Sequence, residues 1–159
     1  MITNMTMTPE EIYKLCDRKL RNRRTMLARA EAAVRKAMDA VGVTSSPMGG
    51  TGGTKSSRKS DKTQKAAILL AMAEKQRDDA LKWLEVFKKL DKVFPERTSE
   101  GFVASLIYGN GMSQQDVCRF CNCARQTVRR KQDRYVNYCA IIASSYGLIN
   151  SEEPDRSID

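Results

Sequence analysis

The sequence predicts an all-α protein in which a long antiparallel helical hairpin is followed by a three-helix helix-turn-helix module. Two long stretches, residues 9–41 and 63–93, carry apolar side chains at helical spacing. Between them, residues 42–62 are rich in Gly and Ser, which predicts a flexible loop. Residues 111–134 have the order of a short helix, a tight turn and a basic second helix.

These stretches divide the 159 residues into three expected parts. Residues 1–94 form the hairpin and the expected oligomerisation region, residues 98–147 form the helix-turn-helix domain, and residues 148–159 form an acidic tail. The net charge of +9 favours a polyanionic partner. No apolar run approaches the roughly 18 to 20 residues of a membrane-spanning helix, and the N-terminus does not have the pattern of a signal peptide. We therefore expect a cytoplasmic protein without a membrane partner.

The first helix has a strong start signal at Thr8-Pro9-Glu10-Glu11. Thr8 is a good N-cap, Pro9 suits the first helical position, and the two carboxylates stabilise the positive end of the helix dipole. The apolar side chains from Ile12 to Val41 keep an imperfect heptad spacing, so we expect one unbroken helix.

The second long helix is expected over residues 63–93, where Pro95 follows its end. Its apolar side chains form one wide stripe that predicts burial. The central members are Ala67, Leu70, Ala73, Leu84, Phe87 and Leu90, and Ile68, Met72, Trp83 and Val86 widen the stripe. Such a stripe is wide enough for more than one neighbouring helix, which favours a homodimer over a lone hairpin.

The loop between the helices contains GGTGGTKS, residues 49–56, which is close to a phosphate-binding loop. Thr54 replaces the required glycine, and no apolar strand precedes the segment. Nucleotide binding is therefore not expected, and neither is a cofactor or a small-molecule substrate. The basic side chains in this loop can contact DNA phosphates instead. They are Lys55, Arg58, Lys59 and Lys62.

The helix-turn-helix module begins with a helix over residues 100–108, which is expected to bury Phe102, Leu106 and Ile107. Ser113 is then the expected N-cap of a short helix over residues 114–120.

Within that short helix, Val117, Phe120 and Cys121 are expected to form the buried face. Asn122 stands where such motifs usually have a turn glycine. Because Asn tolerates the left-handed conformation best among the other residues, we expect it to end the helix in that conformation.

The second helix of the motif is expected from Arg125, with Val128 and Tyr135 pointing inward, and it continues to Gly147. Arg pairs bidentately with guanine and Gln with adenine in a major groove. The candidate base-contacting residues are Gln126, Arg129 and Arg130. The candidate phosphate-contacting residues are Ser113, Gln114, Arg125, Thr127, Lys131 and Arg134.

Five cysteines leave two interpretations open. Cys118, Cys121 and Cys123 could supply three zinc ligands and Cys139 a fourth. Against zinc, the chain has no histidine, a second C-x2-C pair is missing, and the three clustered cysteines stand where the motif needs small or apolar residues. We therefore favour reduced cysteines that pack as small hydrophobes, and expect no metal.

The order of these parts resembles the phage late-gene transcription regulators of the RinA and ArpU type. The segment YGNGMSQQDVCRFCNCARQTVRRKQDR, residues 108–134, is similar to region 4 of sigma-70-type factors, although Ala124 and Asn122 replace the usual Ser or Thr and Gly. The resemblance implies an activator that binds double-stranded DNA upstream of phage packaging or structural genes. The expected location is then the cytoplasm of a bacterial host, and host RNA polymerase stays open as a further partner.

Two other functions remain open. A small terminase subunit also joins a helix-turn-helix to an oligomerising helical region, but usually in the reverse order. A sigma-like factor would use the hairpin to bind the polymerase core. An enzyme is not expected, because histidine is absent and the clustered cysteines have no apparent base partner.

Overall fold

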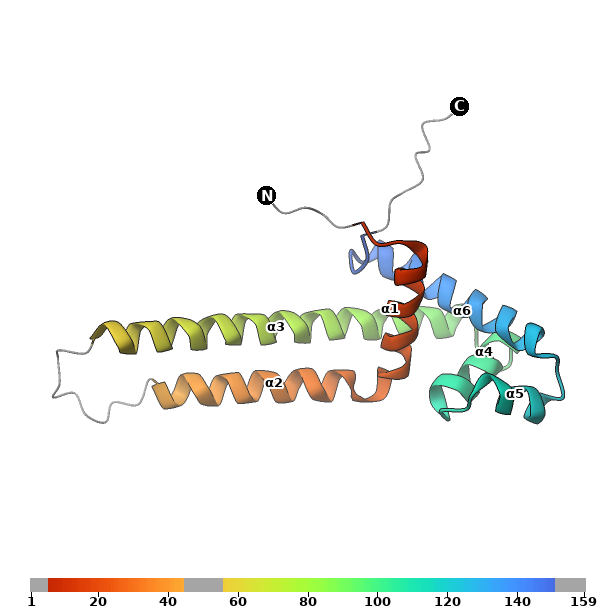
Figure 1. The fold of residues 1–159 in the computed structure, drawn as a ribbon, viewed down its shortest axis with the longest axis horizontal. Helices are drawn as coiled ribbons and strands as arrows, with labels where there is room; N and C mark the ends of the chain where they lie inside the picture. Colours follow the sequence, from red (N-terminus) through yellow and green to blue (C-terminus); the bar gives the residue numbers. More distant parts are fainter. Residues whose placement is uncertain (1–5, 45–55, 151–159) are drawn as a thin grey trace, which may run out of the picture. The chain divides into compact units, whose positions relative to one another are not determined.

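The computed structural model describes residues 6–44 and 56–150, and in these ranges it confirms the predicted all-α fold class. The elements are α1 (Pro9–Arg21), α2 (Arg23–Thr44), α3 (Ser56–Val93), α4 (Ser99–Ala104), the π-helical turn η1 (Ser105–Gly109), α5 (Gln114–Cys121) and α6 (Arg125–Ser145) (Figure 1). The chain divides into two compact units, one of Met1–Arg23 with Lys82–Asp159 and one of Arg24–Leu81. This division differs from the expected ranges 1–94 and 98–147, because α1 and the end of α3 group with the helix-turn-helix module.

The first helix begins as predicted but ends early. The Thr8 side chain accepts a hydrogen bond from the Glu11 N–H, and the Glu11 carboxylate accepts one from the Thr8 N–H. The prediction of one unbroken helix to Val41 is wrong, because α1 ends at Asn22, whose φ is −94° and ψ is 7°. Asn has low helix propensity because its short amide competes for backbone hydrogen bonds.

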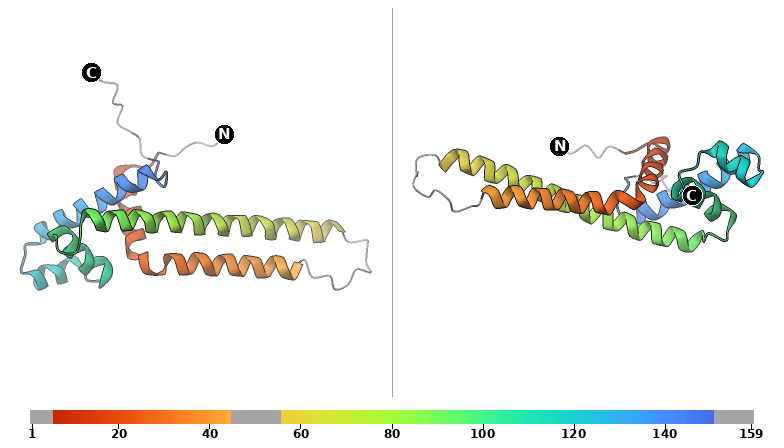
Figure 2. Two further views of the ribbon diagram at one scale, coloured as in Figure 1. Left: turned by 180° about the vertical axis from the view of Figure 1, so that it is seen from behind. Right: turned by 90° about the horizontal axis from the view of Figure 1, so that it is seen from below.

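In the unit Arg24–Leu81, α2 and α3 run antiparallel (Figures 1 and 2). The buried side chains on α2 include Ala30 and Val34. Those on α3 are Ala66, Ala73 and Ala80, at intervals of seven residues. A seven-residue repeat keeps these three alanines in one stripe along α3.

Two expectations for this unit need correction. The predicted loop over 42–62 is too long, because α2 continues to Thr44 and α3 begins at Ser56. Residues 45–55, which include Lys55 and most of the GGTGGTKS segment, lie outside the described residues. Burial was also expected for Ala67, Ile68 and Met72, yet all three are exposed, and Ala66 is the buried alanine instead.

The larger unit has a core of bulky side chains contributed by α1, α3 and α6. Leu20, Phe87 and Val136 are completely buried, and they represent one helix each. Trp83 packs against Phe87 with ring centroids 6.0 Å apart. Each side chain of this size contributes about 1.5–3 kcal/mol when removed from water, so this core fixes α1 and α6 together.

The helix α4 is fixed to the chain segment that follows α3. The Thr98 side chain caps α4 by accepting a hydrogen bond from the Gly101 N–H at 3.1 Å. Gly101 is buried so closely against the Pro95 carbonyl that no Cβ atom fits there. Val103 is 4% exposed, whereas Phe102 is 38% exposed. The prediction that Phe102 enters the core is therefore wrong, because its neighbour Val103 occupies the inward position.

Candidate nucleic-acid interface

The helices α5 and α6 are joined by the predicted tight turn. The Ser113 side chain caps α5 by accepting a hydrogen bond from the Asp116 N–H at 3.1 Å. Asn122 ends α5 in the left-handed conformation, with φ 52° and ψ 46°, which confirms the prediction for this residue. Ala124 precedes α6 without a side-chain cap, so the start of α6 lacks the hydrogen bond that Ser or Thr would provide there.

An apolar cluster fixes the crossing of the two helices beneath the turn. It consists of the buried side chains Val103, Leu106, Ile107, Val117 and Val128. Inward positions for Val117, Val128 and Tyr135 were predicted and are confirmed. Phe120 was expected to be buried but is 65% exposed, and its ring lies against that of Phe102, which is also exposed.

The three candidate base-contacting side chains lie on the solvent side of α6. Gln126, Arg129 and Arg130 are all exposed and fall within the first two turns of this helix. Val128, between them, is 1% exposed and faces the core. The N-terminal turns of a second helix are the part that reaches base edges when such a motif lies in a major groove.

The candidate phosphate-contacting residues fall into two groups. Arg125 and Thr127 are exposed on α6. Lys131 is half-buried on the same helix. The other three are engaged within the protein: Ser113 caps α5, Gln114 donates a hydrogen bond to Gln132, and Arg134 pairs with Glu100 at 3.3 Å.

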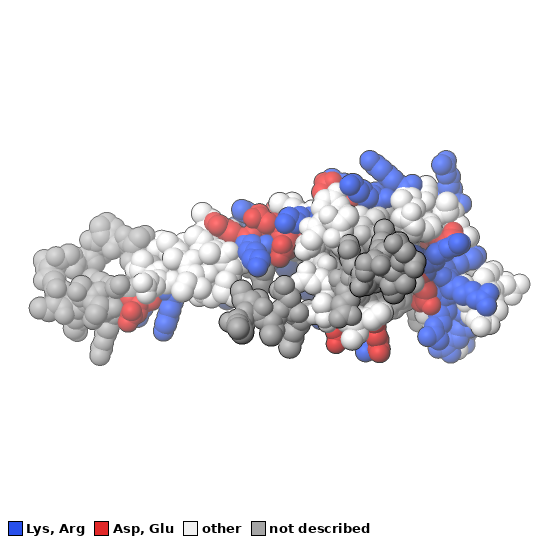
Figure 3. Space-filling view, turned by 90° about the horizontal axis from the view of Figure 1, so that it is seen from above, with Lys and Arg blue, Asp and Glu red and all other residues white. Residues whose placement is uncertain are grey.

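A cleft of about 510 Å³ runs along α6 beside α4. Its lining residues are Glu100, Thr127, Arg130, Lys131, Asp133, Arg134 and Asn137. Three of these are cations, and two are carboxylates that oppose the binding of an anion. Figure 3 shows Lys and Arg side chains gathered in the region of α5 and α6.

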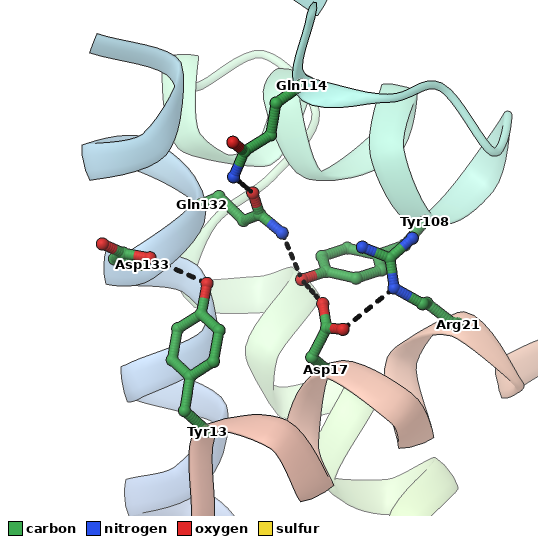
Figure 4. A network of polar contacts seen from close by, with 7 residues as sticks. All are labelled: Tyr13, Asp17, Arg21, Tyr108, Gln114, Gln132 and Asp133. Atoms are coloured by element: carbon green, nitrogen blue, oxygen red, sulfur yellow. Dashed lines mark hydrogen bonds and ion pairs between the residues drawn. The ribbon is translucent and has the colours of Figure 1, made fainter. Parts of the chain in front are cut away.

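A partly buried polar network connects the motif to α1 (Figure 4). At its centre lies Gln132 of α6, which is 3% exposed and uses both ends of its amide. Its oxygen accepts a hydrogen bond from Gln114 Nε2 at 2.6 Å, and its nitrogen donates to Tyr108 Oη at 3.1 Å. The Tyr108 hydroxyl in turn donates to Asp17 Oδ1 at 2.8 Å, and burial raises the pKa of Tyr108.

A second hydrogen bond joins α1 to the outer part of α6. The Tyr13 hydroxyl donates to Asp133 Oδ1 at 2.7 Å (Figure 4). Burial is the largest cause that raises the pKa of Tyr13, and this hydrogen bond is the second. The hydroxyl therefore keeps its proton and remains a donor throughout the physiological pH range. The network therefore fixes the orientation of α6 from a segment more than 100 residues earlier in the chain.

Sequence reasoning missed Tyr13, Asp17 and Glu100, all of which contact this face from outside the motif. No short-range pattern indicates them, because their partners are 120, 91 and 34 residues away. Asp133 did carry a signal, as the one carboxylate in the basic run from Arg125 to Arg134. A lone acid there suggests a specific partner.

Comparison with family models, with curated proteins and with solved structures gave no match. No helix within residues 6–44 or 56–150 is both long and apolar enough to span a membrane.

The cysteines separate into two places. Cys118, Cys121 and Cys123 are half-buried and pack against the apolar cluster of the motif. Cys139 lies instead beside Cys16 of α1, and the hydrogen bond between the thiols, together with burial, raises the pKa of Cys139. In the part of the chain that the structure describes, no group of three or more His, Cys, Asp or Glu side chains could hold a metal ion.

Proposed function

We propose that this chain is a transcription regulator that binds double-stranded DNA with α6 in the major groove. The observation that carries the proposal is the complete geometry of the motif: a capped α5, a left-handed turn at Asn122, and an α6 that buries Val128. The exposed Gln126, Arg129 and Arg130 follow that turn directly, where base edges are read.

The charge distribution supports the same proposal. The net charge of +9 favours DNA over a neutral partner. Arg125 and Thr127, both exposed at the start of α6, are suited to phosphate contacts that position the helix without reading sequence. Activation of phage late genes is the specific role that the resemblance to RinA- and ArpU-type regulators supports.

The test is selection of a binding site from random DNA, followed by fluorescence anisotropy with Arg130→Ala. We expect a loss of about 1–3 kcal/mol on the selected site and a much smaller loss on random DNA, because a base contact acts only on the correct sequence. Arg35→Ala is the matched control, since it removes the same charge from an exposed position on α2.

Equal losses on selected and random DNA would assign Arg130 to a phosphate. Failure of the full-length protein to enrich any sequence would overturn the proposal. Circular dichroism of both variants checks that the helical content is unchanged.

A further inference from the structure

An exposed apolar patch lies on α3 within the unit Arg24–Leu81. Ile68, Leu69 and Met72 are 59%, 57% and 58% exposed, and they occupy little more than one helical turn. Ala66 and Ala73, on the same stretch of α3, are buried instead. Three large apolar side chains grouped in this way indicate an interaction surface rather than scattered surface residues.

Leu69 and Met72 of this patch lie at the centre of a longer line along α3. Its members are separated alternately by three and four residues, which is the spacing of a coiled-coil seam. They are Lys62, Lys65, Leu69, Met72, Gln76 and Asp79, and we call this line the α3 seam. Five of the six side chains are exposed and Asp79 is half-buried.

The charges of the α3 seam are complementary to the same seam turned end to end. Cations lie at its N-terminal end and a carboxylate at its C-terminal end, at equal distances from the midpoint between Leu69 and Met72. An antiparallel second copy would place Lys62 opposite Asp79 and Leu69 opposite Met72. A parallel second copy would instead place Lys62 opposite Lys62.

The two charged ends are available for such a contact. Within the described residues, neither Lys62 nor Asp79 has an ion-pair partner in its own chain. We propose that two copies of this chain associate through the α3 seam, antiparallel, about a two-fold axis between Leu69 and Met72. In such an isologous contact every pair occurs twice. This inference does not rest on the proposed DNA-binding function.

The first test is the mass of the full-length protein in solution, measured by sedimentation equilibrium. We expect a dimer at about 50 µM, and a monomer for Leu69→Glu combined with Met72→Glu, because both changes place buried charge in the interface. Met38→Glu is the matched control, since Met38 is 56% exposed on α2 and lies outside the α3 seam. All three proteins should have the same helical content.

The second test distinguishes antiparallel from parallel pairing. Asp79→Lys alone should weaken self-association about tenfold or more, because two attractive pairs become repulsive, and Lys62→Asp alone should do the same. Parallel pairing would keep like charges opposite each other in the wild type and in either single variant, so neither change would then weaken association. An equimolar mixture of the two variants should restore association, since each chain then presents the charge that the other lacks, which shows that both variants can still associate. The restoration should diminish in 1 M salt, because the Debye length is then only about 3 Å and salt screens the attraction between the charged pairs.

Three results would overturn the proposal. The wild-type protein could remain monomeric at that concentration, the mixture could fail to restore association, or the mass could correspond to a closed ring of many subunits. A ring requires a head-to-tail contact and is incompatible with an isologous seam.

Discussion

At Asn122 one residue determines the angle between α5 and α6. Its backbone is left-handed, with φ 52° and ψ 46°, in a position where most side chains clash with the following carbonyl oxygen. The side chain of Asn is short enough to accept this conformation, and glycine accepts it more readily still.

We therefore expect Asn122→Gly to leave the free energy of unfolding nearly unchanged, and Asn122→Ala to lower it by about 1–2 kcal/mol. Urea denaturation followed by circular dichroism measures both variants. A loss in the glycine variant equal to that in the alanine variant would show that the Asn122 side chain, and not its backbone, stabilises the turn.

Tyr108 supports a second prediction, because its hydroxyl joins the half-buried Asp17 to the buried Gln132. Tyr108→Phe removes the donor to Asp17 and leaves the Gln132 amide nitrogen without its acceptor. We expect a loss of about 1–3 kcal/mol in the free energy of unfolding, measured in urea. Tyr138→Phe is the control, since Tyr138 is 40% exposed, and it should change stability by less than about 0.5 kcal/mol.

Glu100 provides a prediction that depends on the proposed DNA-binding function. Its carboxylate pairs with Arg134 at 3.3 Å beside the cleft along α6. Glu100→Gln should free the Arg134 guanidinium for a phosphate and so raise affinity equally for selected and random DNA. The slope of log affinity against log salt concentration should steepen by the amount expected for about one more phosphate contact. Glu96→Gln, at an exposed position nearby, controls for the change in net charge. Identical effects of the two variants would exclude a specific role for Glu100.

Among the elements, those with local signals were predicted and those set by distant contacts were not. Thr8, Ser113 and Asn122 act through hydrogen bonds or conformations within four residues, so the sequence indicates them directly. The break at Asn22 lacks a Gly or Pro signal, and the apolar spacing continues across it, so a single helix was the natural expectation.

The orientations of α4 and α5 were also beyond local signals. Phe102 and Phe120 are large aromatic residues at plausible inward positions, yet both are exposed and contact each other with centroids 6.4 Å apart. In α4 Val103 occupies the core in place of Phe102, and in α5 Val117 does so as predicted, but without Phe120. Helical spacing identifies an apolar face, but it does not determine which members at the edge of that face are buried.

Gly101 allows the packing of α4 to be tested. Gly101→Ala would press a Cβ atom against the Pro95 carbonyl, so we expect a loss of about 1–3 kcal/mol in the free energy of unfolding. Gly42→Ala in α2 is the matched control, because nothing lies within 4 Å of its Cβ position. That control should raise stability by about 0.5–1 kcal/mol, since alanine is the better helix former. Thermal unfolding in the calorimeter compares the two, and equal effects would exclude the steric argument.

For the whole molecule, the two compact units have different kinds of core. The unit Arg24–Leu81 buries mainly alanine, whereas the larger unit buries Leu20, Phe87, Leu90 and Ile107 completely or almost completely. Buried area per residue is therefore smaller in the first unit, and local opening costs less free energy where few apolar contacts are broken.

Hydrogen exchange detected by mass spectrometry should show this difference. We expect amides of α6 and of residues 82–93 in α3 to exchange last, and amides of α2 to exchange earlier. At higher protein concentration, protection around residues 62–79 should rise if the α3 seam is occupied. Uniform protection across both units would contradict the first expectation.

The hydrogen bond between Tyr13 and Asp133 joins residues 120 positions apart, so it can form only late in the synthesis of the chain. A growing chain emerges from the ribosome N-terminus first, at about 5–20 residues per second. The helix α1 is then complete several seconds before α6 exists. Contacts of long sequence separation form late because they close large loops. The helix α1 is thus synthesised well before α6 but can take its final place only after it, and Cys16 and Leu20 remain exposed to chaperones and oxidants until then.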